Sequence, residues 1–283
     1  MNDATDSSNK FLTGLARASG GALLFSLPML LTMEMWWLGF TMPAMRLAVL
    51  LAVTLPTLMG LAYYSGFEVP QGWVGTVVDA FVAYCVGVVV ASSVLVLIAV
   101  IRSSETMFSE GLGKIVLQAI PASFGAVLAS SQFGDDNDNG RRHEPNGHAH
   151  HDLGCYFREL FLMFAGAIFL AFNVAPTEEM LVIALKMTAW HAIAMGLCSL
   201  VVMHAFVFVV KFRGQEAVPD ESSQGSVFLR FTIPGYAIAL LASLFCLWVF
   251  GRLEDTALEE TLMATMVLAT PAAVGAAAAR LVL

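Results

Sequence analysis

The chain has 283 residues, of which 58% are hydrophobic and 13% are charged, and its formal net charge is −8. Soluble domains carry about 25% charged residues, so this composition excludes a soluble enzyme and places the chain in a lipid bilayer. The acidic balance also argues against a nucleic-acid partner, because such a partner requires a basic surface.

A helix needs about 20 apolar residues to cross a bilayer. Eight stretches meet this length: 13–38, 44–66, 73–101, 112–132, 156–174, 179–211, 229–251 and 258–281. The fourth and the eighth are rich in Ala, Gly and Ser, yet their central parts carry no charge. The sequence therefore predicts an all-α, polytopic transmembrane bundle of about eight spans, the alternative being six spans with two helices that do not cross.

Two segments of the chain resemble each other around a carboxylate in an apolar run. Residues 21–35 align with residues 166–180 at an offset of 145 (177 − 32), and five of the fifteen positions are identical. The identical positions include Thr32, Glu34 and Met35, which match Thr177, Glu179 and Met180. Two Ala- and Leu-rich helices could share this much by chance.

A second pair of segments, 105–129 and 255–279, aligns without gaps at an offset of 150. The identities there include Thr106/Thr256, Glu110/Glu260, Leu112/Leu262, Pro121/Pro271, Gly125/Gly275 and Ala129/Ala279. We therefore predict two internal repeats, 1–133 and 156–283, joined by a polar linker at 134–155. With four spans each the repeats would face the same way, whereas with three each they would be inverted.

Basic residues orient the eight-span arrangement. Nine Lys and Arg residues fall on the side of the termini and four on the other side. Because basic residues concentrate in cytoplasmic loops, both termini are predicted to be cytoplasmic. In the six-span arrangement the basic residues are distributed just as unequally, but they predict the opposite orientation. Their distribution therefore does not decide between six and eight spans.

The predicted linker holds four of the six histidines: His143, His148, His150 and His151. Imidazoles at this density are candidate ligands for Zn²⁺ or Ni²⁺, or groups that sense pH. No cysteine accompanies them, so a plain polar linker is the alternative. The sequence implies no cofactor.

Glu34 and Glu179 are the leading candidates for function. Ionisable groups inside a membrane span are costly and usually face a bundle interior or water. A helix that starts after Pro176 with Thr177 as N-cap would instead hold Glu179 in its first turn, where the macrodipole favours acids. Two such carboxylates, each preceded by a threonine (Thr32 and Thr177), would attract cations, and a symmetric homodimer would present four.

Acidic residues also concentrate on the predicted non-cytoplasmic face. Nine acids meet four bases there, which would concentrate cations at a pore mouth. A solvated acidic loop without function explains the same residues. This predicted outer vestibule comprises Glu105, Glu110, Glu178, Asp255 and Glu260, together with Glu34, Glu179, Glu254 and Glu259.

Lys186 lies nine residues after Thr177, or about 13 Å along a continuous helix, close to the midplane of a span. It shares a helix face with Glu179 and is a candidate partner of Glu34, Glu179 or Asp79. A structural ion pair and a moving counter-charge in a coupled transporter are the two interpretations.

The opening residues 11–28, followed by Thr32-Met-Glu34-Met-Trp36-Trp37-Leu-Gly-Phe40, resemble a family of bacterial integral membrane proteins that has no assigned activity. The resemblance extends from about residue 11 to the end of the chain. It implies a multi-pass protein of the bacterial inner membrane and supplies no catalytic residues.

These patterns predict a cation channel or a cation-coupled transporter with Glu34 and Glu179 at its constriction. Its partners would be the lipid bilayer and a small cation. The alternative is a membrane scaffold or lipid-handling protein with a structural Glu/Lys pair. No His/Asp/Ser constellation has convincing spacing, so we do not expect an enzyme.

Overall fold

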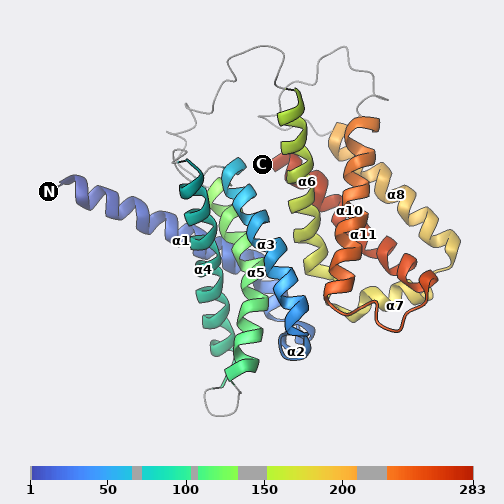
Figure 1. The fold of residues 1–283 in the computed structure, drawn as a ribbon, viewed down its shortest axis with the longest axis horizontal. Coiled ribbons are helices and arrows are strands. Elements are labelled where there is room, and N and C mark those ends of the chain that lie inside the picture. The colour runs from blue at the N-terminus through green and yellow to red at the C-terminus, as the bar shows by residue number, and fades with distance from the viewer. Residues whose placement is uncertain (1, 66–71, 103–107, 133–151, 209–227, 283) are drawn as a thin grey trace. The chain divides into compact units, whose positions relative to one another are not determined.

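The structure is a computed structural model that describes residues 2–65, 72–102, 108–132, 152–208 and 228–282. Within these ranges it is helical, with ten α-helices, one short π-helix and no strand (Figure 1). The chain divides into two compact units, Met1–His148 and Ala149–Leu283, and each is described by itself. The predicted all-α membrane bundle is confirmed.

Unit 1 contains a long helix, a short helix and three further long helices. These are α1 (Asn2–Leu30), α2 (Met33–Thr41), α3 (Ala44–Ser65), α4 (Gly72–Leu97) and α5 (Phe108–Gln132).

Unit 2 has the same order of long and short elements. Its helices are α6 (Asp152–Val174), α7 (Glu178–Lys186), α8 (Ala189–Phe208), the π-helix η2 (Phe228–Thr232) that continues into α10 (Ile233–Val249), and α11 (Leu258–Val282).

Seven helices in the described ranges are long and apolar enough to cross a membrane, and α1 bent into α2 gives an eighth if that pair is one span. The two doubtful stretches are among them, as Phe108–Ala129 and Leu258–Ala279. The arrangement of six spans, in which these two helices do not cross the membrane, is therefore less favoured.

Two predicted spans are broken rather than continuous. The stretch 13–38 ends as α1 at Leu30 and turns by 86° into α2. The stretch 179–211 is divided at Met187, where extended backbone separates α7 from α8. In Figure 1, α7 runs crosswise to α6 at the end of unit 2. In unit 2 the first break follows from Pro176, because a proline disfavours helical backbone in the residue before it.

The helices α5 and α11 are the centres of their units, since each contacts every other α-helix of its unit. Glycine permits the closest contacts. A Cβ on Gly21 of α1 would overlap Ala129 and the carbonyl of Gly125 on α5, and a Cβ on Gly166 of α6 would overlap the carbonyl of Gly275 on α11. Small residues at helix crossings allow such close backbone approach in membranes. The Ala- and Gly-rich composition that made these spans doubtful is what lets their neighbours pack around them.

Candidate functional site

The break between α1 and α2 is held by side chains that bind freed backbone carbonyls. The hydroxyl of Thr32 donates to the carbonyl of Met29 at 2.9 Å, and the indole N–H of Trp36 donates to the carbonyl of Leu30 at 2.8 Å. Thr32 is the N-cap residue of α2 by position, but its side chain does not cap the helix. Glu34 lies half-buried in the first turn of α2.

The break between α6 and α7 has the same construction. The hydroxyl of Thr177 donates to the carbonyl of Val174 at 2.8 Å, and the Nη2 of Arg252 donates to the carbonyl of Pro176. The helix starts directly after Thr177, which confirms the predicted start of α7. Glu178 and Glu179 occupy its first turn and are exposed within unit 2.

The construction of the two breaks favours a structural contribution from the acids that follow them. The last carbonyls of a helix have no intrahelical partner, and protein donors bind several of them here. The first-turn carboxylates lie at the positive end of the α2 and α7 macrodipoles, a position that stabilises them. Glu34 belongs to unit 1 and Glu179 to unit 2, so their facing across one axis stays a prediction.

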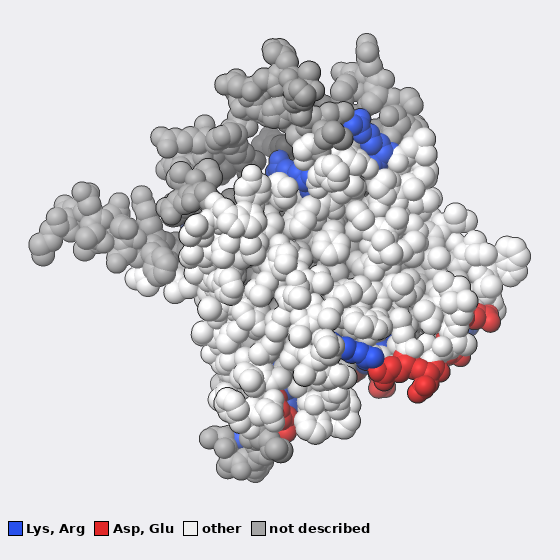
Figure 2. Space-filling view, viewed as in Figure 1, with Lys and Arg blue, Asp and Glu red and all other residues white. Residues whose placement is uncertain are grey.

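The end of unit 2 that carries α7 is acidic. Figure 2 shows acidic side chains (red) gathered over α7 and the turn that leads into α11, below a broad surface of uncharged residues (white). Asp255 lies in this turn with a φ of 56°, and a side-chain oxygen of Glu260 accepts a bond from the backbone N–H of Ala257 at 3.3 Å. The residues of this cluster are Glu178, Glu179, Glu254, Asp255, Glu259 and Glu260, all exposed.

The corresponding end of unit 1 holds an ion pair that we did not predict. The Nζ of Lys114 lies 2.5 Å from the Oε1 of Glu110, four residues earlier on α5. Lys114 is buried, and Gly39 of α2 packs against its backbone and Cγ. Glu110 is therefore not a freely solvated vestibule acid. The i, i+4 spacing of the two residues is the sequence signal that could have found the pair.

Gln118 lies one turn further along α5 and is completely buried. Neither its Nε2 nor its Oε1 has a hydrogen-bond partner in the described structure. At the matching positions of unit 2, 150 residues later, α11 carries Glu260, Ala264 and Leu268. The residues of α11 that match Lys114 and Gln118 are thus apolar.

The predicted continuous span 179–211, on which the midplane position of Lys186 rested, is wrong. Lys186 occupies the last turn of α7 and is exposed, and the next span begins at Ala189. A lysine at a helix C-terminus is stabilised by the macrodipole, which accounts for its position. Asp79 lies half-buried in α4 of unit 1, so its pairing with Lys186 of unit 2 stays a prediction.

Several predicted residues lie outside the described ranges. These are Glu105 and the four linker histidines, His143, His148, His150 and His151. Within the described ranges, no group of three or more His, Cys, Asp or Glu residues could hold a metal ion.

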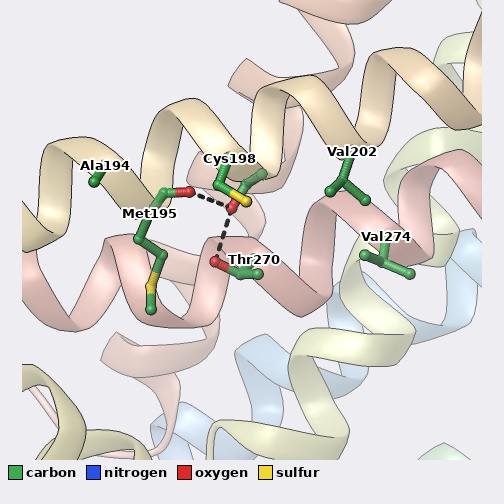
Figure 3. Close-up of a pocket in the computed structure, with 7 residues that line it drawn as sticks. Ala194, Met195, Cys198, Val202, Thr270 and Val274 are labelled. Atoms are coloured by element: carbon green, nitrogen blue, oxygen red, sulfur yellow. Dashed lines mark hydrogen bonds between the residues drawn. The ribbon is translucent and has the colours of Figure 1, made fainter.

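An apolar groove of about 410 Å³ lies between α8 and α11 of unit 2 (Figure 3). Its polar contact is a hydrogen bond of 2.8 Å between the hydroxyls of Ser199 and Thr270, which joins the two helices. Besides these two residues, the lining comprises Ala194, Met195, Cys198, Val202 and Val274.

The helical fold, with seven described helices long and apolar enough to cross a bilayer, defines a polytopic helical membrane protein. The chain belongs to the family described as "Putative integral membrane protein (DUF2391)", whose model matches residues 14–283. No curated protein and no solved structure matches the chain.

Proposed function

We propose that this protein is a cation-coupled transporter in which carboxylates at matching places in the two units attract the cation. One observation supports it above the others: carboxylates occur at matching places in both units. Glu34 and Glu179 follow the broken first helix, and Glu110 and Glu260 open the last helix. Repeated halves with broken helices are a construction that secondary transporters use.

Internal duplication is part of this proposal. Both units have the same element order, and both close their first and last helices through a glycine pair. The pairs match in register, since 21 + 145 = 166 and 125 + 150 = 275. Four spans in each unit would relate the halves by an axis along the membrane normal. With basic residues on the side of the termini, the acidic ends would face away from the cytoplasm of a bacterial inner membrane.

A coupled transporter fits the buried charges better than an open channel does. Lys114 lies behind the first acid of α5, and a fixed ammonium there would repel cations in a continuous pore. In a transporter the same ammonium would be a counter-charge that moves when cargo binds.

The test is cation flux into liposomes that contain the purified chain. Glu34→Gln and Glu179→Gln should each lower flux at least about tenfold, because each removes a charge that attracts the cation. Glu159→Gln is the matched control, because it removes a carboxylate near the start of α6, at the end of that helix opposite α7 and outside the acidic cluster. Unchanged flux in both the Glu34 and the Glu179 variants, with the control also unchanged, would refute the proposal.

A lipid-handling protein or scaffold is the second candidate, and the groove between α8 and α11 favours it. The groove is lined almost entirely by apolar side chains, as an acyl chain would require. On this alternative Glu110 and Lys114 are a structural pair. The protein would then show no flux, and a bulky Ala194→Phe substitution in the groove would reduce the lipid that copurifies with it.

A further inference from the structure

A line of polar side chains enters unit 1 along one face of α5. Glu110, Lys114 and Gln118 are spaced by four residues, which places them on successive turns of the same face. Exposure falls along this line, from 26% for the Glu110 side chain to 11% for Lys114 and 0% for Gln118. Gln118 lies about 12 Å deeper than Glu110, near the middle of the span Phe108–Ala129.

Gln118 is an acceptor and a donor without a partner. Polar side chains in the middle of a span are expensive unless they bind another group, because lipid and apolar side chains offer no hydrogen bonds. Lys114 is four residues from Gln118 and four residues from Glu110. Its long, flexible side chain can therefore place the ammonium on either neighbour, and in the structure it is on Glu110.

The space around the ion pair attracts cations. The carbonyl of Gly39 is close against Gly113 of α5, and it belongs to the last turn of α2. Carbonyls in the last turn of a helix carry the negative end of the macrodipole. The negative end of the α2 macrodipole therefore lies against the Gly113 and Lys114 segment of α5, and the ammonium of Lys114 binds the carboxylate of Glu110.

We propose that Glu110 is a binding site for a small monovalent cation, that Lys114 is its internal competitor, and that Gln118 accepts the ammonium when the cation binds. Lys114 keeps its proton, and no covalent bond changes. The cation binds the carboxylate of Glu110, and the ammonium of Lys114 moves inward to the Oε1 of Gln118. The two positive charges are then separated. This exchange deepens the proposed transport function and rests on it for the route by which the cation leaves.

Unit 2 supplies natural controls for this site. It carries Ala264 and Leu268 where unit 1 carries Lys114 and Gln118. Lys114→Ala and Gln118→Leu therefore install residues that a helix of the same construction already accommodates. Glu159 lies on α6 of unit 2 and outside the acidic cluster, so Glu159→Gln should leave cation binding to Glu110 unchanged.

The experiment measures the melting temperature of the purified full chain against Na⁺ concentration, at constant pH and with choline chloride keeping ionic strength constant. A ligand that binds the folded state stabilises it by RT ln(1 + [L]/Kd), so the dependence of the melting temperature on Na⁺ concentration yields an apparent Kd. We expect Na⁺ to stabilise the wild type. Gln118→Leu should weaken apparent Na⁺ affinity by about tenfold or more, because it removes a hydrogen bond to a charged group.

Lys114→Ala should act in the opposite direction and tighten Na⁺ binding by about tenfold, since the competitor is gone. Glu110→Gln in the Lys114→Ala background, which avoids an unpaired buried lysine, should abolish the Na⁺ effect. A purely structural pair would not move the affinity in opposite directions in the Lys114 and Gln118 variants. A wild type insensitive to Na⁺, or a Gln118→Leu variant with unchanged affinity, would overturn the proposal.

Flux separates this proposal from the transport proposal. If the Na⁺ pattern of the variants appears but liposomes show no flux, the site stands and the transport function fails. If flux depends on Glu34 and Glu179 while Na⁺ leaves the melting temperature unchanged, the proposed cation exchange at Glu110 is wrong and the proposed transport function is supported.

Discussion

Gly39 of α2 and Lys114 of α5 meet with their backbones in contact. A Cβ at position 39 would lie 2.6 Å from the Cα and 2.9 Å from the backbone N of Lys114. Backbone atoms of a helix cannot move aside as a flexible side chain can. This contact therefore fixes the short helix α2 against the central helix of unit 1, directly over the ion pair with Glu110.

Gly39→Ala is expected to separate α2 from α5. The added methyl group overlaps the Lys114 backbone, and overpacking of this kind costs about 1–3 kcal/mol. We expect a lower melting temperature in detergent and greater exposure of Trp36, measured by its fluorescence in a variant that lacks the other tryptophans. A melting temperature equal to that of wild type would show that α2 does not rest on α5 at this position.

Gly21→Ala tests the crossing between α1 and α5, and the neighbouring glycine is the control. A Cβ at Gly21 meets Ala129 and the Gly125 carbonyl, whereas a Cβ at Gly20 has no atom within 4 Å. Gly21→Ala should destabilise by about 1–3 kcal/mol, while Gly20→Ala should be neutral or stabilising by up to about 1 kcal/mol from helix propensity. Thermal unfolding measures the stability of both variants. Equal losses of stability would contradict the close contact between α1 and α5 at Gly21.

In unit 2 the corresponding change is Gly166→Ala, with Gly154→Ala as its control, since a Cβ at Gly154 also meets nothing. If the two units are repeats of one construction, Gly166→Ala should cost about as much as Gly21→Ala. If Gly21→Ala destabilises the protein and Gly166→Ala does not, the crossing of α6 with α11 is not equivalent to the crossing of α1 with α5.

The spans, the first-turn acids and the helix start after Pro176 could be predicted from the sequence, whereas hydropathy did not show the breaks after Leu30 and at Met187. Hydropathy stays high through Leu31 and Met187, because those residues are apolar whether the helix continues or turns. A sum over a window of residues contains no information about the backbone direction. This is why Lys186 was expected near the midplane and instead lies at the end of α7.

The central position of α5 and α11 was also hidden by composition. Alanine and glycine lower the hydropathy of a span, which made these helices look doubtful, although small side chains are what a central helix needs. The pair of Glu110 and Lys114 was visible as an i, i+4 spacing. Its burial was not, because that burial depends on α2 packing against α5, and this packing follows from the turn after Leu30, which hydropathy does not show.

Arg252→Met tests the break between α6 and α7. The guanidinium of Arg252 donates to the carbonyl of Pro176, 76 residues away in sequence, and so joins the α10–α11 turn to the start of α7. A hydrogen bond to a charged donor contributes about 1.5–3 kcal/mol. The variant should lose stability by about that amount and should exchange the backbone amide protons of α7 faster, as measured by hydrogen exchange. Faster amide exchange confined to α8 would contradict the prediction that Arg252 holds the start of α7.

Ser199→Ala tests whether the hydroxyl pair in the groove joins α8 to α11. The Ser199 hydroxyl also donates to the Met195 carbonyl within α8, so the substitution removes one local bond and one bond between helices. Bonds between helices in membranes contribute about 0.6 kcal/mol on average, so each single substitution should have a small effect. The decisive measurement is a double-mutant cycle with Thr270→Val, which isolates the bond across the groove from the local one. A coupling energy of about 0.6 kcal/mol supports the bond between the two hydroxyls. Strictly additive losses would mean that α8 and α11 are held by apolar contacts alone, and that the groove can open without breaking a polar contact.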